Sequence, residues 1–106
     1  MSTGQPHHPP TLAEALAMLV AHRRELEAAG VARAGVFGST ARGAAGMGSD
    51  IDVLLEFAAG REPDLFTYAG LRRRVAEIVP GADVIAADAL RPEMAETVRQ
   101  DVVHAF

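Results

Sequence analysis

The sequence contains no cysteine and no lysine. Without cysteine, the chain can form neither a disulfide framework nor a thiolate metal site or nucleophile. All 10 basic residues are arginines, and with 14 acidic residues they give a formal net charge of -4. That charge argues against direct binding of nucleic acid, because a general grip on phosphates needs many cations. No apolar run approaches the roughly 20 residues that a membrane span requires, so we expect no membrane segment.

The length of 106 residues favours one domain, because domains typically contain about 100–200 residues. Met1–Pro10 is rich in proline and histidine and has no apolar periodicity, which predicts a disordered tail at 1–10. The same segment lacks the positive start and apolar centre of a secretory signal. We therefore expect a cytoplasmic protein whose single domain occupies residues 11–106.

Periodicity and breaking residues predict alternating helices and strands in that domain. Thr11 and Glu14 form a capping-box pattern that opens the first helix, and Gly30 ends it. The predicted strands are 31–37, 50–57 and 82–86, the predicted long helices are 12–29, 64–79 and 92–100, and a short helix is predicted at 39–45. Val102–Phe106 fits either a last strand or the end of the final helix.

This order predicts an α/β fold of the α+β kind, with a small mixed sheet of three to four strands flanked by helices. The full helix between the second and third strands suits a parallel crossover. One side of that helix is expected to face the core through Leu65, Tyr68, Leu71, Val75, Ile78 and Val79.

A Gly-Ser pair after the first predicted strand is suited to phosphate binding. Gly38 lets a ligand approach the main chain, because it has no Cβ. Ser39 starts the short predicted helix, whose free N–H groups and dipole favour a phosphate. Arg42 lies one turn further on and can reach a phosphate or hold the loop through a salt bridge. We predict that Gly38, Ser39 and Arg42 bind a phosphate group of a ligand.

Three aspartates are the candidate catalytic and metal-binding residues. Asp50 and Asp52 lie two residues apart on a predicted strand, so both carboxylates face one side. Carboxylates in this arrangement suit Mg²⁺, which also binds substrate phosphates. If the third strand lies beside the second, Asp83 reaches the same metal and can act as general base for an acceptor hydroxyl.

Each part of this pattern has a structural alternative. Gly-Ser is a common dipeptide, an isolated Asp-x-Asp is weak evidence, and Ser49-Asp50 can simply end a turn. Only the combination favours a nucleotide site. The basic run Arg72-Arg73-Arg74 favours a solvated helix face, with a partner or phosphate contact as the alternative. Glu56 shares the strand face of Asp52 but is left outside the site.

The combined pattern resembles the signature of the DNA polymerase beta-like nucleotidyltransferase superfamily. The sequence at 37–43 and 49–55 is most similar to the minimal nucleotidyltransferases, and the similarity spans about Leu12–Val103. The resemblance implies the polymerase beta-like fold, ATP as nucleotide donor and Mg²⁺ as cofactor. By position it gives Asp50, Asp52 and Asp83 the roles of the three metal-binding carboxylates. Thr40 and the proline-free loop at 46–48 depart from the family pattern.

Minimal members of this superfamily often pair with a helical HEPN-family toxin. The resemblance therefore implies an antitoxin that transfers AMP from ATP to a tyrosine hydroxyl of such a toxin, in a hetero-oligomer. The alternative is a non-catalytic antitoxin that neutralises its partner by binding. An enzyme acting alone on a small molecule is disfavoured, since the chain has no residues left for an acceptor-binding region. Action on the end of tRNA is disfavoured by the negative charge.

Overall fold

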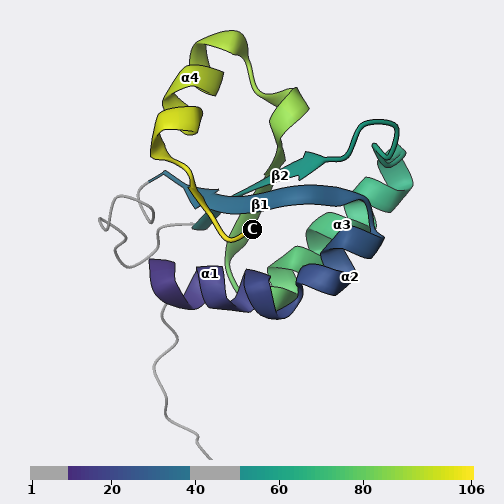
Figure 1. Ribbon diagram of the computed structural model, residues 1–106, viewed down its shortest axis with the longest axis horizontal. Coiled ribbons are helices and arrows are strands. Elements are labelled where there is room, and N and C mark those ends of the chain that lie inside the picture. The colour runs from purple at the N-terminus through teal and green to yellow at the C-terminus, as the bar shows by residue number, and fades with distance from the viewer. Residues whose placement is uncertain (1–9, 39–50) are drawn as a thin grey trace, which may run out of the picture.

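The computed structural model describes residues 10–38 and 51–106, arranged as a four-stranded mixed sheet with helices on both faces (Figure 1). The sheet order is β3-β2-β1-β4. The helices are α1 Leu12–Ala21, α2 Arg23–Ala28, α3 Leu65–Ile78, the 3₁₀ turn η1 Ala87–Ala89 and α4 Pro92–Asp101. The strands are β1 Val31–Phe37, β2 Ile51–Phe57, β3 Ala82–Ala86 and β4 Val103–His104.

The strand pairing confirms the predicted mixed sheet. β1 runs antiparallel to β2 and β4, whereas β2 and β3 are parallel and α3 forms the crossover between them. Residues 102–106 hold a strand rather than the end of a helix, because Val103 and His104 pair with Val36 and Gly35. The predicted α/β fold is therefore correct in both its class and its sheet.

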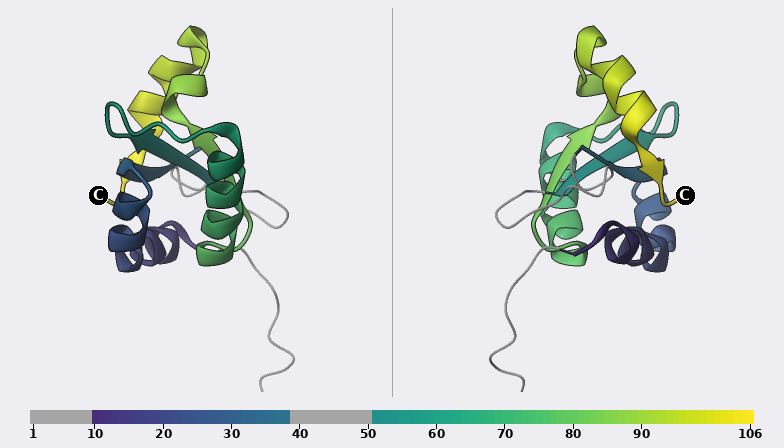
Figure 2. Two further views of the ribbon diagram at one scale, coloured as in Figure 1. Left: turned by 90° about the vertical axis from the view of Figure 1, so that its right-hand side faces the viewer. Right: turned by 90° about the vertical axis from the view of Figure 1, so that its left-hand side faces the viewer.

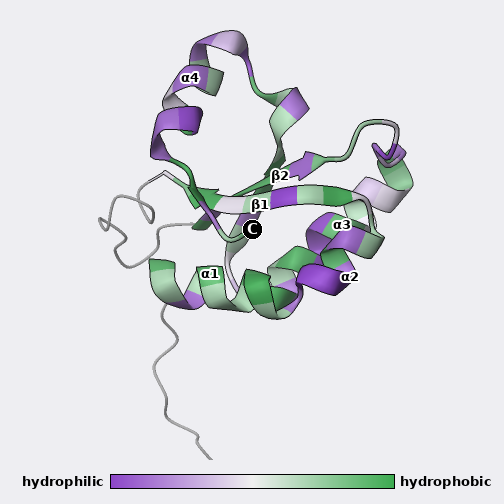
Figure 3. Cartoon of the chain, in the orientation of Figure 1, coloured by the Kyte–Doolittle hydropathy of each residue, from purple (hydrophilic) through white to green (hydrophobic). Residues whose placement is uncertain are grey.

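The two faces of the sheet are covered unequally. Helices α1, α2 and α3 pack against one face and form the main core, while α4 stands on the other (Figures 1 and 2). On the α4 face, Phe37 and Leu54 pack against Val98 in a small cluster. α1 is mostly hydrophobic and α4 more hydrophilic (Figure 3). Polar side chains of β2 and β3 can therefore remain accessible on the α4 face.

The predicted helix at 12–29 is wrong in one respect, because it is interrupted at His22. The His22 ring donates from Nδ1 to the carbonyl oxygen of Met18 at 2.9 Å. The His22 amide instead bonds to the carbonyl of Leu19 at 3.2 Å. The side chain thus takes the acceptor that a continuous α-helix would give to the main chain. The predicted capping box at Thr11 is confirmed.

The first turn of α3 does not face the core as predicted. Leu71, Val75 and Ile78 are buried, but Leu65 is 79% exposed. Leu65 precedes Val75 by ten residues, which places it about 80° around the helix from the buried side. Tyr68 is half-buried and not in the core, and its ring meets Phe57 edge to face.

Three predicted features lie outside the described residues: the tail up to residue 9, the short helix at 39–45, and the start of the strand at 50. Pro10, the last residue of the predicted tail, is described and buried. None of the described helices has the length and apolar character needed to cross a lipid bilayer.

Candidate active site

Two of the predicted catalytic carboxylates lie side by side. Asp52 on β2 is directly opposite Asp83 on β3 in the parallel register. Opposed residues on neighbouring strands point to the same face, and the strands are about 4.8 Å apart. Both carboxylates therefore lie on the α4 face of the sheet, at the end where β2 begins. β3 lies beside β2, as the predicted role of Asp83 requires.

Gly38 lies against the carboxylate of Asp52. The residue before it, Phe37, ends β1 opposite Asp52, and Gly38 then turns with φ +80°. A Cβ on Gly38 would collide with Oδ2 of Asp52. Glycine is needed here for two reasons, the left-handed backbone and the close approach of the carboxylate. The glycine of the Gly-Ser pair and the second aspartate of Asp-x-Asp thus form one local unit.

The other predicted site residues, Ser39, Arg42 and Asp50, lie outside the described residues. Their roles stay predictions. The structure brings together Gly38, Asp52 and Asp83.

Arg72 is a neighbour of this site that the sequence interpretation placed on a solvated face. Its Nη2 lies 3.8 Å from Oδ1 of Asp83, and both side chains are about half exposed. Its guanidinium also lies 5.9 Å from the centre of the Tyr68 ring. α3 packs on the opposite face, but β3 is an edge strand, so Arg72 reaches Asp83 around that edge. An exposed ion pair of this kind contributes about 0–1 kcal/mol to stability. A bound metal cation can therefore readily replace Arg72 as the partner of Asp83.

A hollow of about 240 Å³ separates Gly38 from α4, and its walls were not predicted as part of the site. Its lining comprises Phe37, Gly38, Glu93, Met94, Thr97, Val98 and Asp101. One sequence signal could have indicated this wall: Glu93, Thr97 and Asp101 recur every four residues and so share a helix face. Their oxygens border the space beside the candidate carboxylates.

The oxygen atoms of Asp52 and Asp83 are ligands that suit Mg²⁺. No group of three His, Cys, Asp or Glu side chains placed to hold a metal occurs among residues 10–38 and 51–106. The two aspartates are therefore the described part of the expected ligand set, and its third predicted member is Asp50. Paired carboxylates beside an open glycine backbone suit a cation and a phosphate together, the needs of phosphoryl or nucleotidyl transfer.

Comparison with known proteins also indicates nucleotidyl transfer. The nucleotidyltransferase domain family matches residues 19–100. A protein adenylyltransferase MntA from Thermococcus cleftensis is 35% identical over 96 residues, which cover 89% of this chain and 95% of that protein. The structure of a minimal nucleotidyltransferase has a TM-score of 0.64 at 32% identity, over 86% of this chain and 88% of the other. This likeness confirms the predicted nucleotidyltransferase fold.

A crystal structure of a toxin–antitoxin with AMP-PNP superposes with a TM-score of 0.69 at 16% identity. It covers 86% of this chain and 72% of that chain. At this identity the likeness concerns the fold alone. The part of the chain that the family match spans includes Gly38, Asp52 and Asp83.

Proposed function

Because this chain belongs to the nucleotidyltransferase domain family, we propose that it is a protein adenylyltransferase and an antitoxin. It transfers AMP from ATP to a tyrosine hydroxyl of a HEPN-type toxin. The observation that carries the proposal is the pairing of Asp52 with Asp83 beside Gly38. The adenylyltransferase from T. cleftensis supports a protein as acceptor. The resemblance of the motif segments to minimal nucleotidyltransferases supports the toxin and its tyrosine.

The proposed residue roles follow from the arrangement of the site. Asp52 and Asp83, with Asp50, hold Mg²⁺, which when bound neutralises charge on the triphosphate. Gly38, with Ser39 and Arg42, places the triphosphate along the open backbone after β1. Asp83 takes the proton of the acceptor hydroxyl. The hydroxyl oxygen then bonds to the α-phosphorus as the α–β phosphoanhydride bond breaks, and pyrophosphate leaves.

The acceptor hydroxyl has to come from a second protein. Asp52 and Asp83 lie on the α4 face, and Asp83 is on the edge strand β3. Among the described residues, α4 is the helix that covers this face, so a side chain of another molecule can approach there. A flexible or protruding tyrosine of the toxin fits this requirement, because its hydroxyl extends well beyond its backbone. The enzyme and toxin are therefore expected to form a complex during transfer.

The proposal is tested by incubating purified toxin with the enzyme, Mg²⁺ and ATP labelled at the α-phosphate. We expect Asp52→Asn to reduce labelling by at least about 100-fold, because one metal-binding charge is lost. Glu96→Gln on α4 is the matched control, since it removes one exposed carboxylate away from the site. Equal labelling by both variants, with both folded by circular dichroism, would contradict the catalytic assignment.

Neutralisation by binding alone remains a second candidate, favoured by the exposed apolar side chains at the start of α3. A double variant, Asp50→Asn with Asp52→Asn, separates the two functions in cells that express the toxin. Survival with this variant would indicate that binding neutralises the toxin. Loss of protection would indicate that AMP transfer is required.

A further inference from the structure

Two consecutive apolar side chains at the start of α3 are almost fully exposed. Leu65 is 79% exposed and Phe66 is 90% exposed, whereas the other large apolar side chains exposed in the described part of the chain, Val20, Met94 and Val103, range from 37% to 51%. Asp64 caps the helix at this point through its bond to the Thr67 amide. The cap fixes the first turn, so both apolar side chains are held outward. Adjacent apolar side chains with this degree of exposure are suited to burial against a partner.

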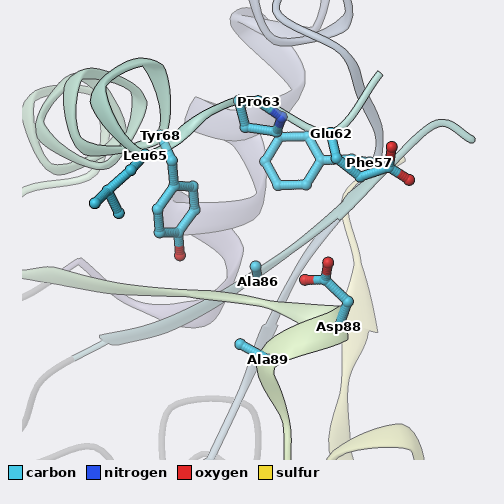
Figure 4. A pocket seen from close by; sticks show the side chains of 8 residues that line it. All are labelled: Phe57, Glu62, Pro63, Leu65, Tyr68, Ala86, Asp88 and Ala89. Atoms are coloured by element: carbon cyan, nitrogen blue, oxygen red, sulfur yellow. The ribbon is translucent and has the colours of Figure 1, made fainter. Parts of the chain in front are cut away.

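A hollow of about 280 Å³ lies beside this apolar pair (Figure 4). Its lining comprises Phe57, Glu62, Pro63, Leu65, Tyr68, Ala86, Asp88 and Ala89. The rings of Phe57 and Tyr68 meet edge to face, with centres 6.3 Å apart. Asp88 extends its carboxylate toward the space below these rings (Figure 4). The hollow thus combines aromatic walls with an acidic group.

The charged residues that line the hollow, Glu62 and Asp88, are both acidic. A second depression shares Phe57, Glu62 and Asp88 with this hollow and is also lined by Glu56. Within residues 10–38 and 51–106, none of these three carboxylates forms an ion pair. Three arginines lie nearby. Arg33 is opposite Glu56 on β1, Arg72 lies against the Tyr68 ring and reaches Asp83, and Arg61 donates to the main-chain carbonyls of Glu27 and Ala28. None of them pairs with Glu62 or Asp88. A positively charged side chain is therefore the favoured occupant.

This surface lies at the opposite end of β2 from the candidate active site. Phe57 ends the strand, and Asp52 stands five residues earlier, which corresponds to about 16 Å along a strand. A protein bound at this end can contact the chain without covering the Asp52 and Asp83 carboxylates. Docking and transfer can thus use separate surfaces of the same chain.

We propose that Leu65, Phe66 and the adjoining hollow form a docking patch for the toxin partner. An arginine or lysine of the partner enters the hollow, where its charge meets Asp88 and Glu62 beside the ring of Phe57. Its aliphatic stem lies against Ala86 and Ala89, while apolar partner residues cover Leu65 and Phe66. The identity of the partner rests on the proposed function; the chemistry of the surface rests on the patch itself.

The test measures the Kd of the chain for the purified toxin by calorimetry, without nucleotide, at low and high salt. We expect Leu65→Ser with Phe66→Ser to raise Kd by at least about 30-fold, as loss of a central apolar contact does. Asp88→Asn should raise Kd about 5- to 10-fold and weaken its salt dependence. Val20→Ser, which alters an exposed apolar residue of α1, is the matched control and should leave Kd unchanged.

The outcomes separate docking from catalysis. An unchanged Kd for the Leu65→Ser, Phe66→Ser variant would overturn the docking patch even if AMP transfer proceeds, and so would the absence of any complex with the wild-type chain. A complex that the patch variants weaken, but in which no AMP is transferred, would support the docking patch and contradict the proposed transfer. Because the replaced side chains are exposed, their variants should keep the wild-type melting temperature within a few degrees.

Discussion

At the scale of single residues, Gly38 carries two constraints at once. Its φ of +80° is unfavourable for residues with a side chain, and its missing Cβ leaves room for Oδ2 of Asp52. Gly60 has the same backbone angle, φ +79°, but open space where a Cβ would stand. The two glycines therefore separate the cost of backbone strain from the cost of displacing a candidate catalytic carboxylate.

We expect Gly60→Ala to lower the free energy of unfolding by about 1 kcal/mol from strain alone. Gly38→Ala should lower it by about 2–3 kcal/mol and also abolish AMP transfer, because Asp52 must move. Urea denaturation and the labelling assay measure the two effects. Similar stability losses in the two variants, with transfer retained in Gly38→Ala, would show that Asp52 does not depend on this glycine.

At the scale of elements, one ion pair joins α3 to α2. Arg74 donates from Nε and Nη2 to both carboxylate oxygens of Glu25, at 2.5 and 3.0 Å. It also reaches Glu77 one turn along α3, at 3.3 Å. The guanidinium hydrogen bond lowers the pKa of Glu25 from its usual 4.5 and, in turn, raises the pKa of Arg74.

The lowered pKa of Glu25 gives the pair a defined pH dependence. Its contribution to stability is present above the unfolded pKa of 4.5 and is lost as the pH falls through the lower folded value. Arg74→Gln should therefore destabilise the protein slightly at neutral pH, and by less at a pH well below 4.5. Thermal unfolding at both pH values measures this, with Arg73→Gln as the control. A deficit of the same size at low pH would contradict the role of Glu25.

Elements were predictable where local patterns decide them. β1 and β3 have their predicted limits because each apolar run is bounded by glycine or by a change to polar residues. The break at His22 was not predictable. It depends on whether the imidazole forms a hydrogen bond with the carbonyl of Met18 or with solvent. Local sequence favours a continuous helix here, and a side-chain hydrogen bond decides otherwise.

At the scale of the whole molecule, the position of Asp83 relative to Asp52 could be predicted from the order of the strands and helices. The full helix between the second and third strands suits a parallel crossover, and Asp83 lies opposite Asp52 because β3 pairs directly with β2. The contact of Arg72 with Asp83 and the hollow under α4 were missed. Both depend on which strand lies at the sheet edge and on where α4 returns over the sheet, and these are long-range arrangements without a local signal.

The unequal cover of the two sheet faces has a consequence for motion. Among residues 10–38 and 51–106, α1, α2 and α3 share the main core. The buried residue of α4 is Val98, which packs in a smaller cluster with Phe37, Leu54 and their half-buried neighbours. Regions with little buried apolar surface open at lower free energy. α4 should therefore open locally before α3 does.

Hydrogen exchange tests this difference directly. We expect amides of α4 to exchange at least about 10-fold faster than those around Val75 of α3. Because α4 also walls the hollow beside Gly38, ATP with Mg²⁺ should slow exchange in α4 and leave α3 unchanged. Asp52→Asn should remove that protection, since it weakens nucleotide and metal binding at the same face. Equal exchange in α3 and α4, or protection that survives Asp52→Asn, would show that α4 is neither the weak layer nor linked to the nucleotide site.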